Sequence, residues 1–401
     1  MSDYDSYRAA ARAWLQSMAS EFGKEARRGL SEEQDLALGR RYLAKRYDAG
    51  YGGIHLPVEF GGRGLSYVEK LIFDIEEMGF GMPIVYFSIS LGMPVPIIIR
   101  FVEDREWVRE RVVKALRGEE IWCQLFSEPA GGSDLAGLRT RAEPDGDGWK
   151  VNGQKLWTSW AQYADYGIMV ARTDPTVPKH KGLTYFWVNM HAPGVKVRPI
   201  KLAEGGHDVN EVFLDDVRLE DAQRMSPVGG GFGVAMATLM IERYAATDSN
   251  GFGPSLDNLV ELARGLEING KPALQDGRVR SAVARNHAMR AGLDSITTRA
   301  MLSMQAGKEP GPEGALNKLF SVRSRQKLSE FAIDLQGEKG VSFDPDGLFT
   351  EDWTTSWIAA PTGRIAGGAD EMLLNTIAEK ILGLPQDHRP DKGIPFNQIP
   401  A

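Results

Sequence analysis

The chain has 401 residues, of which 42% are hydrophobic and 25% are charged, and its formal net charge is -7. This length exceeds what one compact core organises and predicts two or three domains. The acidic balance argues against general nucleic-acid binding, and the lone cysteine, Cys123, excludes an intrachain disulfide and a cysteine-rich metal site, so no metal is expected. Because one cysteine fits a reducing compartment and the first residues lack a signal-peptide pattern, we expect a cytoplasmic location.

The N-terminal part carries apolar residues at helical spacing and predicts a helical domain over residues 1–120. Its longest apolar stretch, Met82–Phe101, contains Pro83, Pro94 and Pro96. Prolines break helices, so this stretch is expected to form kinked buried helices and not a membrane span.

Between residues 121 and 219 the apolar period changes to two, which predicts short strands. We expect a hairpin from Trp149 to Trp157 whose type I′ turn is Asn152-Gly153. Further strands are expected at Gly167–Arg172, Leu183–Met190, Val195–Ile200 and Glu211–Val217. Several strands joined by turns favour a barrel or sandwich, and we expect an antiparallel β-barrel as the middle domain over residues 121–219.

Helical periodicity returns after Gly231 in blocks at about 231–265, 273–307, 314–336 and 368–382. We expect Gly253-Pro254 to interrupt the first block. The blocks predict a C-terminal four-helix bundle over residues 225–384. The tail, residues 385–401, is rich in proline and charge and is expected to be flexible. The fold class is therefore α+β with three domains.

Four segments carry a family resemblance through their order and spacing. They are Leu56–Ser66, Gln124–Asp134, Asn152–Ser159 and Gln336–Gly340, with Arg364–Leu382 following at the expected distance. The pattern resembles the acyl-CoA dehydrogenases over nearly the whole chain. That resemblance implies a helical domain, a β-barrel and a helical bundle, and it implies FAD as the cofactor.

Enzymes of this family remove the pro-R α-hydrogen of an acyl-CoA as a proton and pass the β-hydrogen as hydride to flavin N5. The product is a trans-2-enoyl-CoA. By resemblance, Ser127 would bind the pyrimidine edge of the flavin, Trp157 would pack against its ring and Ser159 would donate near N5. Ser133 would contact the acyl-CoA, and Arg243 would support the pocket or contact the substrate. The expected flavin contacts on this chain's own cofactor are Gln124, Phe126, Ser127, Trp157, Thr158 and Ser159.

The catalytic base is expected at Glu242. Many family members place a glutamate before a Gly-Thr pair in the last helical segment, but Gly367 occupies that position here. A minority use a glutamate directly before an arginine in the first bundle helix, and Glu242-Arg243 matches that pair. The Gly367 amide would then help to hold the thioester oxygen. The competing interpretations are a structural glutamate paired with Arg243, or a base at Asp370 or Glu371, which lie three to four residues beyond the usual position.

Some expected contacts to the FAD of a neighbouring subunit are altered. Leu266 stands where an arginine usually contacts the pyrophosphate, Asp334 replaces a glutamine, and Ala369 replaces a threonine that meets the flavin. Gln336 and Gly337 remain as expected contacts to the cofactor. These departures fit either an altered site in a homotetramer or homodimer, or a heteromeric complex with a related chain, as in a branch of bacterial steroid-degrading relatives.

Three functions are compatible with these observations. The first is an acyl-CoA dehydrogenase that passes electrons to an electron-transfer flavoprotein. The second is a subunit that only completes a partner's FAD site, and the third is a flavin oxidase of the same superfamily. Retention of Glu242 and the flavin-edge segments favours the first. Glutamate at this position occurs in members that accept long, branched or bulky acyl groups, and we expect Ile84–Ile99 and Ala235–Ala246 to wall the acyl pocket.

Overall fold

The computed structural model describes residues 3–245, 254–305, 311–341 and 353–399. The chain forms two compact units: Met1–Lys201, His207–Glu242 and His388–Ala401 make the first, and Leu202–Gly206 with Arg243–Asp387 make the second. Helices precede and follow a strand-rich middle part, so the expected fold class is confirmed.

The N-terminal part of the first unit is helical. Capping boxes start two of its helices, at Ser31 with Gln34 and at Ser66 with Glu69; each cap contributes about 1 kcal/mol. Pro94 begins a new helix after a break at Met93, as the prolines predict. No described helix is long and apolar enough to cross a membrane. The helices are α1 (Asp3–Phe22), α2 (Glu32–Asp48), α3 (Tyr67–Phe80), α4 (Ser88–Gly92), α5 (Pro94–Phe101) and α6 (Arg105–Leu116).

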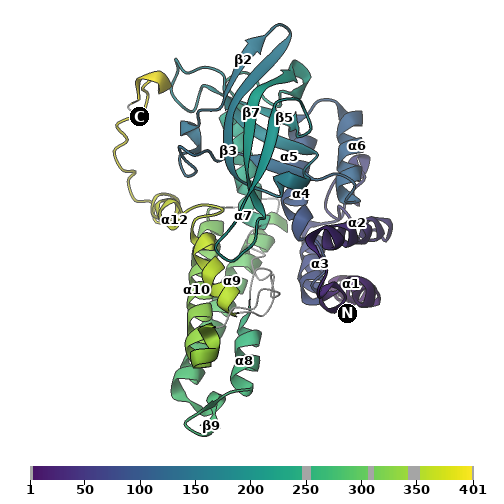
Figure 1. Ribbon diagram of the computed structural model, residues 1–401, viewed down its shortest axis with the longest axis vertical. Helices are drawn as coiled ribbons and strands as arrows, with labels where there is room; N and C mark the ends of the chain where they lie inside the picture. Colours follow the sequence, from purple (N-terminus) through teal and green to yellow (C-terminus); the bar gives the residue numbers. More distant parts are fainter. Residues whose placement is uncertain (1–2, 246–253, 306–310, 342–352, 400–401) are drawn as a thin grey trace. The chain divides into compact units, whose positions relative to one another are not determined.

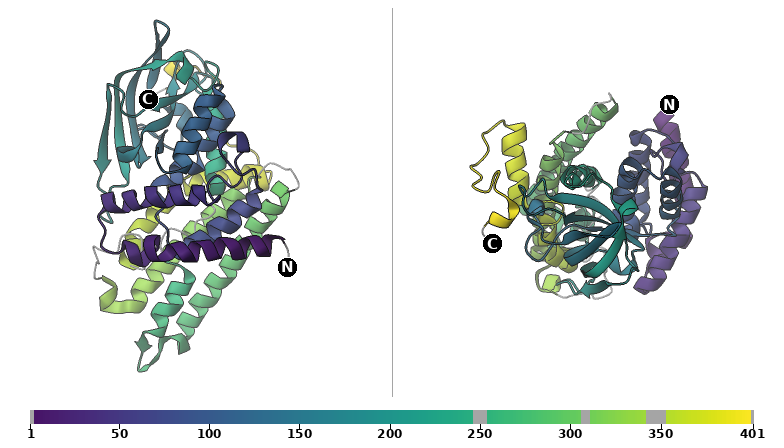
Figure 2. Two further views of the ribbon diagram at one scale, coloured as in Figure 1. Left: turned by 90° about the vertical axis from the view of Figure 1, so that its right-hand side faces the viewer. Right: turned by 90° about the horizontal axis from the view of Figure 1, so that it is seen from above.

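The middle part of the first unit is a curved half-barrel of seven strands with the order β1-β4-β2-β3-β7-β6, and β5 pairs with β4. The pairs are antiparallel, except that β4 runs parallel to β1 and β2. Trp122, Val170 and Tyr185 belong to the buried core between the strands and α5 and α6. Figure 2 shows the N-terminal helices gathered on one side of the strands. The strands are β1 (Trp122–Leu125), β2 (Arg141–Asp145), β3 (Gly148–Ser159), β4 (Tyr166–Arg172), β5 (Leu183–Asn189), β6 (Val195–Ile200) and β7 (Val209–Glu220).

The predicted hairpin turn at Asn152-Gly153 is wrong. Both residues lie inside β3, where the register against β7 shifts. The Asn152 side chain exchanges hydrogen bonds with Asp216, and a Cβ at Gly153 would lie 2.4 Å from Thr140 Oγ1. Gly153 therefore allows a close strand approach at a bulge, and the hairpin turn lies between β2 and β3 at Gly146, whose φ is 64°.

The second unit is mostly helical. Helices α8 (Leu256–Arg264), α9 (Gly277–Gln305) and α10 (Gly314–Gln336) lie side by side (Figure 1). Leu259, Leu328 and Trp353 form part of their core. The bounds of α10 match the expected block, whereas α11 (Trp353–Ala359) was not expected. The last block divides into α12 (Asp370–Thr376) and a π-helical turn, η11 (Ile377–Ile381).

The expected helical block that starts at residue 231 contains two helices. Helix α7 (Gly231–Ala245) ends before the predicted break and α8 begins after it. Gly253 and Ala246 lie outside the described residues. A short hairpin, β8 (Glu267–Ile268) and β9 (Lys271–Pro272), follows α8. Asn269 and Gly270 form its turn, with φ of 52° and 72°, as a type I′ turn requires.

The C-terminal tail differs from the expected flexible segment. Its described end contacts the loop between β4 and β5 in the first unit. The Phe396 and Asn397 N–H groups donate to the carbonyls of Val177 and Pro175, both at 2.9 Å. A short helix, η12 (Phe396–Gln398), forms at this contact. The tail is therefore attached to the half-barrel.

Candidate flavin and substrate site

The end of β1 and the loop that follows it place three expected flavin contacts at one edge of the half-barrel. Gln124 and Ser127 are half-buried, and Phe126 is buried. The Leu156 N–H donates to the Ser127 carbonyl at 2.8 Å. The loop therefore lies directly beside β3, which carries the other expected flavin contacts.

Trp157 points outward from β3, although an indole is usually buried. Its side chain is 55% exposed. Its φ is 61°, a left-handed conformation that costs a residue other than glycine about 1–2 kcal/mol. The register of β3 against β7 shifts between Lys155 and Thr158, so Trp157 lies in a bulge. A strained backbone that presents a large apolar ring to solvent is typical of a ligand-binding position.

Thr158 and Ser159 complete this edge of β3. Thr158 is buried, its carbonyl accepts a 3.0 Å hydrogen bond from the Asn210 amide, and its Oγ1 has no hydrogen-bond partner among the described residues. Ser159 is half-buried. A buried hydroxyl without a partner costs free energy unless a ligand or water satisfies it.

These residues fit a flavin, which needs hydrogen-bond donors at its ring edge and an apolar wall. Gln124, Ser127 and Ser159 can supply amide and hydroxyl donors. The exposed indole of Trp157 can supply the wall, and the Thr158 hydroxyl is a further donor without a described partner.

A buried ion pair fixes the two segments that carry these residues. The Lys155 Nζ is 0% exposed and lies 2.8 Å from the Glu128 carboxylate, which also accepts from the N–H groups of Arg139 (2.6 Å) and Thr140 (3.0 Å). Burial by itself raises the pKa of Glu128, but the Lys155 charge and these hydrogen bonds outweigh it and hold that pKa below its usual range. The pair therefore locks the loop after β1 onto β3.

Ser133 lies exposed on the loop Gly131–Asp134, which we call the substrate loop. A turn follows this loop, and hydrogen bonds from Arg172 fix the turn. The Arg172 side chain is buried and donates to the carbonyls of Ala136 at 2.6 Å and Leu138 at 3.1 Å. The substrate loop is thus anchored on both sides, by Glu128 before it and by Arg172 after it.

Helix α7 packs one face on the half-barrel. Ala235 and Thr238 are buried, and the Thr238 hydroxyl lies 2.9 Å from the Tyr185 hydroxyl. Glu242 follows them at helical spacing near the end of α7. The side chains of Glu242 and Arg243 lie outside what the structure describes.

In the second unit, Gly367 lies in a loop with unusual backbone geometry. Gly367 and Gly368 have φ of 64° and 104°, which favour glycine. The buried Lys318 donates to the Gly368 carbonyl at 2.6 Å, which fixes the loop to α10. The loop can therefore present the Gly367 N–H in a fixed direction.

Asp370, one of the competing bases, has a structural role. Its carboxylate is 4% exposed and accepts from Arg323 at 2.9 Å and from Arg364 at 2.7 Å. Two arginine partners leave it poorly suited to take a proton from a substrate. Glu371, the other competitor, is exposed at the start of α12.

The altered positions and the remaining expected contacts also lie in the second unit. Leu266 packs beside the small core around Ala263, so its role is structural.

Gln336 ends α10, and its amide donates to the Ala332 carbonyl at 3.1 Å. Gly337 follows with φ of 58°. Ala369 precedes α12, and its methyl side chain accepts no hydrogen bond from the N–H groups of the first turn. Asp334 lies in the last turn of α10.

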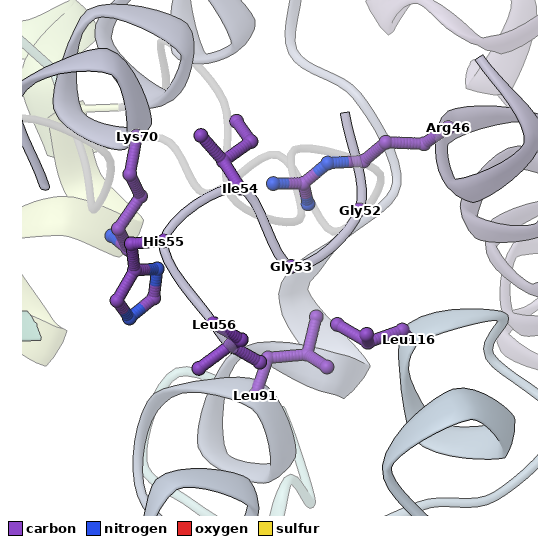
Figure 3. Close-up of a pocket in the computed structure, with 9 residues that line it drawn as sticks. All are labelled: Arg46, Gly52, Gly53, Ile54, His55, Leu56, Lys70, Leu91 and Leu116. Carbon is purple, nitrogen blue, oxygen red and sulfur yellow. The ribbon is translucent and has the colours of Figure 1, made fainter. Parts of the chain in front are cut away.

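A small cavity among the N-terminal helices is separate from this edge (Figure 3). Its volume is about 50 Å³, and Arg46, His55 and Lys70 contribute polar groups to its wall. Space of this size holds water and not a flavin. Burial, with a smaller contribution from the Lys70 charge, lowers the pKa of His55 to about 4, so its imidazole is neutral at pH 7.

The helical N-terminal part, the half-barrel with a flavin-fitting edge and the helical second unit match the architecture that the resemblance implies for an acyl-CoA-oxidising flavoprotein. The sequence matches the N-terminal domain of the acyl-CoA dehydrogenases over residues 2–120, the middle domain over 123–217 and the C-terminal domain over 229–382. The chain belongs to the acyl-CoA dehydrogenase family, so it is an FAD-dependent oxidoreductase.

Known proteins of similar length resemble the whole chain. Acyl-CoA dehydrogenase IpdE1 of Mycobacterium tuberculosis is 34% identical over 397 residues, which cover 96% of this chain and 99% of the relative. The ChsE4–ChsE5 complex from M. tuberculosis is 26% identical with a TM-score of 0.78, covering 96% and 99% of the two chains. The Tcur3481–Tcur3483 steroid ACAD has the same fold, with 23% identity, a TM-score of 0.80 and the same coverage.

Several residues of the site escaped the sequence analysis. Glu128 lies in the segment Gln124–Asp134 and Lys155 lies in the segment Asn152–Ser159. Because both segments were expected to line one site, their opposite charges were a sequence signal for an ion pair. Arg172 ends an apolar strand and carries no local signal. Lys318 looks like an ordinary helical lysine.

Proposed function

We propose that the chain oxidises an acyl-CoA to the trans-2-enoyl-CoA, with Glu242 as the base that takes the α-proton. The observation that carries this proposal is that positions 367 and 370 offer no free carboxylate. Position 367 is a glycine with left-handed backbone, and the Asp370 carboxylate is engaged by two arginines. With Gly367 unable to act and Asp370 occupied, Glu242 is the strongest candidate that the family resemblance offers.

The other residues have binding and orienting roles in this proposal. The Gly367 N–H donates to the thioester oxygen and so makes the α-proton more acidic. Ser133 contacts the acyl-CoA from the substrate loop, and Trp157 covers the ring of the cofactor. FAD, when bound, supplies the acceptor for the β-hydrogen. We further propose an electron-transfer flavoprotein as the electron acceptor.

We propose a long, branched or bulky acyl group as the substrate, in line with the position of the base. Residues Ile84–Ile99 and Ala235–Ala246 then contribute to the wall of the acyl pocket, although the side chains after Ile241 lie outside the described residues. A panel of straight, branched and ring-bearing acyl-CoAs tests this choice. The highest kcat/KM on short straight chains would refute it.

The test of the base is anaerobic reduction of the bound flavin by acyl-CoA in matched variants. Glu242→Gln should slow flavin reduction by about 10²–10⁴-fold, the range for loss of a general base. Glu371→Gln is the control, because it makes the same chemical change at the exposed competitor. Wild-type rates in Glu242→Gln, or a large loss only in Glu371→Gln, would overturn the assignment.

The altered interface positions favour a second candidate, a chain that works in a heteromeric complex. Leu266, Asp334 and Ala369 all change contacts that the resemblance assigns to cofactor binding, and the similar ChsE4–ChsE5 structure is a complex. We propose a homo-oligomer first, because homo-oligomers are commoner. A protein purified alone without flavin, which becomes yellow only with a second chain, would establish the heteromeric form. Oxygen consumption without an added acceptor would instead indicate an oxidase.

A further inference from the structure

The C-terminal tail reaches the back of the substrate loop. The part of the tail from His388 onward belongs to the first unit, and its yellow ribbon ends beside the loops of the half-barrel (Figure 1). Besides the two backbone hydrogen bonds of Phe396 and Asn397, Pro395 forms a β-bridge with Pro178. The tail thus extends the loop between β4 and β5 by a short paired segment.

The first side-chain contact of the tail is made by Phe396. The Arg172 guanidinium carbon lies 3.5 Å from the centroid of the Phe396 ring. The same guanidinium donates to Ala136, Leu138 and the Lys179 carbonyl. The aromatic ring therefore covers the cation that holds the turn after the substrate loop. A desolvated cation–π contact is attractive and favours a fixed position of the guanidinium over the ring.

The second side-chain contact is an ion-pair bridge. The Lys179 ammonium lies 2.8 Å from the Asp134 carboxylate of the substrate loop and 2.6 Å from the Asp391 carboxylate of the tail. The Lys179 side chain is only 15% exposed, so it is held in place between the two acids. A hydrogen bond from Lys179 lowers the pKa of Asp391, so this acid is charged at neutral pH.

We propose that Phe396 and Asp391 are positioning residues for the substrate loop. The tail fixes Arg172 and Lys179 from one side, and these two cations fix Asp134 and the following turn from the other. Ser133, which directly precedes Asp134 in the substrate loop, is thereby held ready for its ligand. This inference rests on the proposed role of Ser133 in binding acyl-CoA.

The test compares Phe396→Ala and Asp391→Asn with conservative and neutral variants of the same tail. Phe396→Tyr keeps the ring, Asp391→Glu keeps the charge, and Lys392→Ala changes an exposed neighbour. In the FAD-loaded enzyme, Phe396→Ala and Asp391→Asn should each raise the KM for acyl-CoA about tenfold, which corresponds to 1.4 kcal/mol of binding. The limiting rate of flavin reduction and the FAD content should remain within about twofold of wild type, because the base is untouched. The conservative and neutral variants should keep the wild-type KM.

Amide hydrogen exchange separates this inference from the proposed function, because it needs no substrate. Amides of residues 131–138 should exchange about tenfold faster in Phe396→Ala than in Lys392→Ala, while β3 amides stay unchanged. Unchanged exchange and unchanged KM in Phe396→Ala and Asp391→Asn would overturn the inference. If no acyl-CoA reduces the flavin of the wild-type protein, KM cannot be measured and the proposed function fails. Faster exchange of residues 131–138 in Phe396→Ala than in Lys392→Ala would still support the positioning role. Similar losses of bound FAD, of kcat and of affinity for acyl-CoA would indicate general unfolding and would also overturn the inference.

Discussion

At the scale of single residues, the site depends on buried charges that are paired. Glu128 and Lys155 are almost completely removed from solvent. Glu128 follows Ser127 in the chain, and the Lys155 ammonium donates to the Phe126 carbonyl at 3.2 Å. Such a pair contributes little net stability compared with apolar packing, but loss of one partner leaves an uncompensated buried charge. The pair is therefore a sensitive point for both stability and cofactor binding.

Lys155→Met should lower the free energy of unfolding by about 3–5 kcal/mol, because it leaves the Glu128 carboxylate buried without its counter-ion. Urea unfolding at pH 7 measures this loss, and the absorbance of bound flavin reports the site. The double variant Glu128→Gln/Lys155→Met should lose less than the sum of the two single changes. Additive losses would show that the two side chains do not act as a pair.

His55 should make stability depend on pH in a defined window. Its pKa is lowered to about 4 by burial first and by the Lys70 charge second, while the nearby Asp74 opposes the shift. Between that pH and about 6.5, the unfolded chain binds a proton that the folded chain excludes, so stability falls as the pH falls through this range. The full loss corresponds to about 3 kcal/mol.

Unfolding of wild type and His55→Phe between pH 4 and pH 8 checks this expectation. The phenyl ring keeps the edge-on contact with Tyr67 but cannot be protonated. The stability difference between the two proteins should therefore change between pH 4 and about 6.5 and stay constant above pH 7. Parallel curves over the whole range would contradict a buried neutral His55.

At the scale of elements, the chain has three Asn-Gly pairs, of which Asn152-Gly153 and Asn269-Gly270 lie in the part that the structure describes. These two pairs have the same sequence but occupy different structures. Asn269-Gly270 forms the turn between β8 and β9, as local turn preferences predict. Asn152-Gly153 lies within β3, where its glycine is needed because Thr140 approaches closely. The difference comes from contacts across the sheet, which a local pattern does not contain.

Alanine should lower the free energy of unfolding more at Gly153 than at Gly270. Gly153→Ala places a Cβ 2.7 Å from the Thr140 Cα, a backbone atom that cannot step aside; the expected loss is about 2–3 kcal/mol. Gly270 has open space around it, so Gly270→Ala should cost only the left-handed strain of about 1 kcal/mol. Asparagine tolerates that conformation, so Gly270→Asn should be nearly neutral, whereas Gly153→Asn should be as harmful as alanine. Thermal unfolding measures all four variants, and equal losses at both positions would refute the distinction.

Regular elements were predictable because their periodicity is local. The bounds of α10 and β6 coincide with the expected ranges, whereas α11, a short helix, was not found. Within the candidate site, the resemblance proposed motif residues such as Ser127 and Trp157, which the structure places at one edge of the half-barrel. Arg172 and Phe396 were not found, because their contact joins residues far apart in sequence and leaves no pattern in either segment.

At the scale of the whole molecule, the second unit exposes large apolar side chains that the described residues of this chain leave uncovered. Trp357, Ile365, Leu382 and Leu384 are 48%, 71%, 65% and 53% exposed. Large apolar side chains that are exposed on a single chain are candidates for burial in a protein interface. This unit also carries Gln336, whose expected role is to contact a neighbour's FAD, so assembly and cofactor binding should be coupled.

The double variant Leu382→Glu/Leu384→Glu should weaken assembly and release FAD together. We expect the wild-type chain to sediment at a multiple of 44.2 kDa, because burial of these side chains in an interface contributes about 1.5–3 kcal/mol each. The glutamate variant should shift toward the monomer mass in sedimentation velocity, and its flavin absorbance per chain should fall. Val58→Glu is the matched control, since Val58 is 66% exposed in the first unit and should tolerate the charge. A wild-type monomer that binds one FAD would contradict the coupling, because the cofactor would then need no neighbouring subunit.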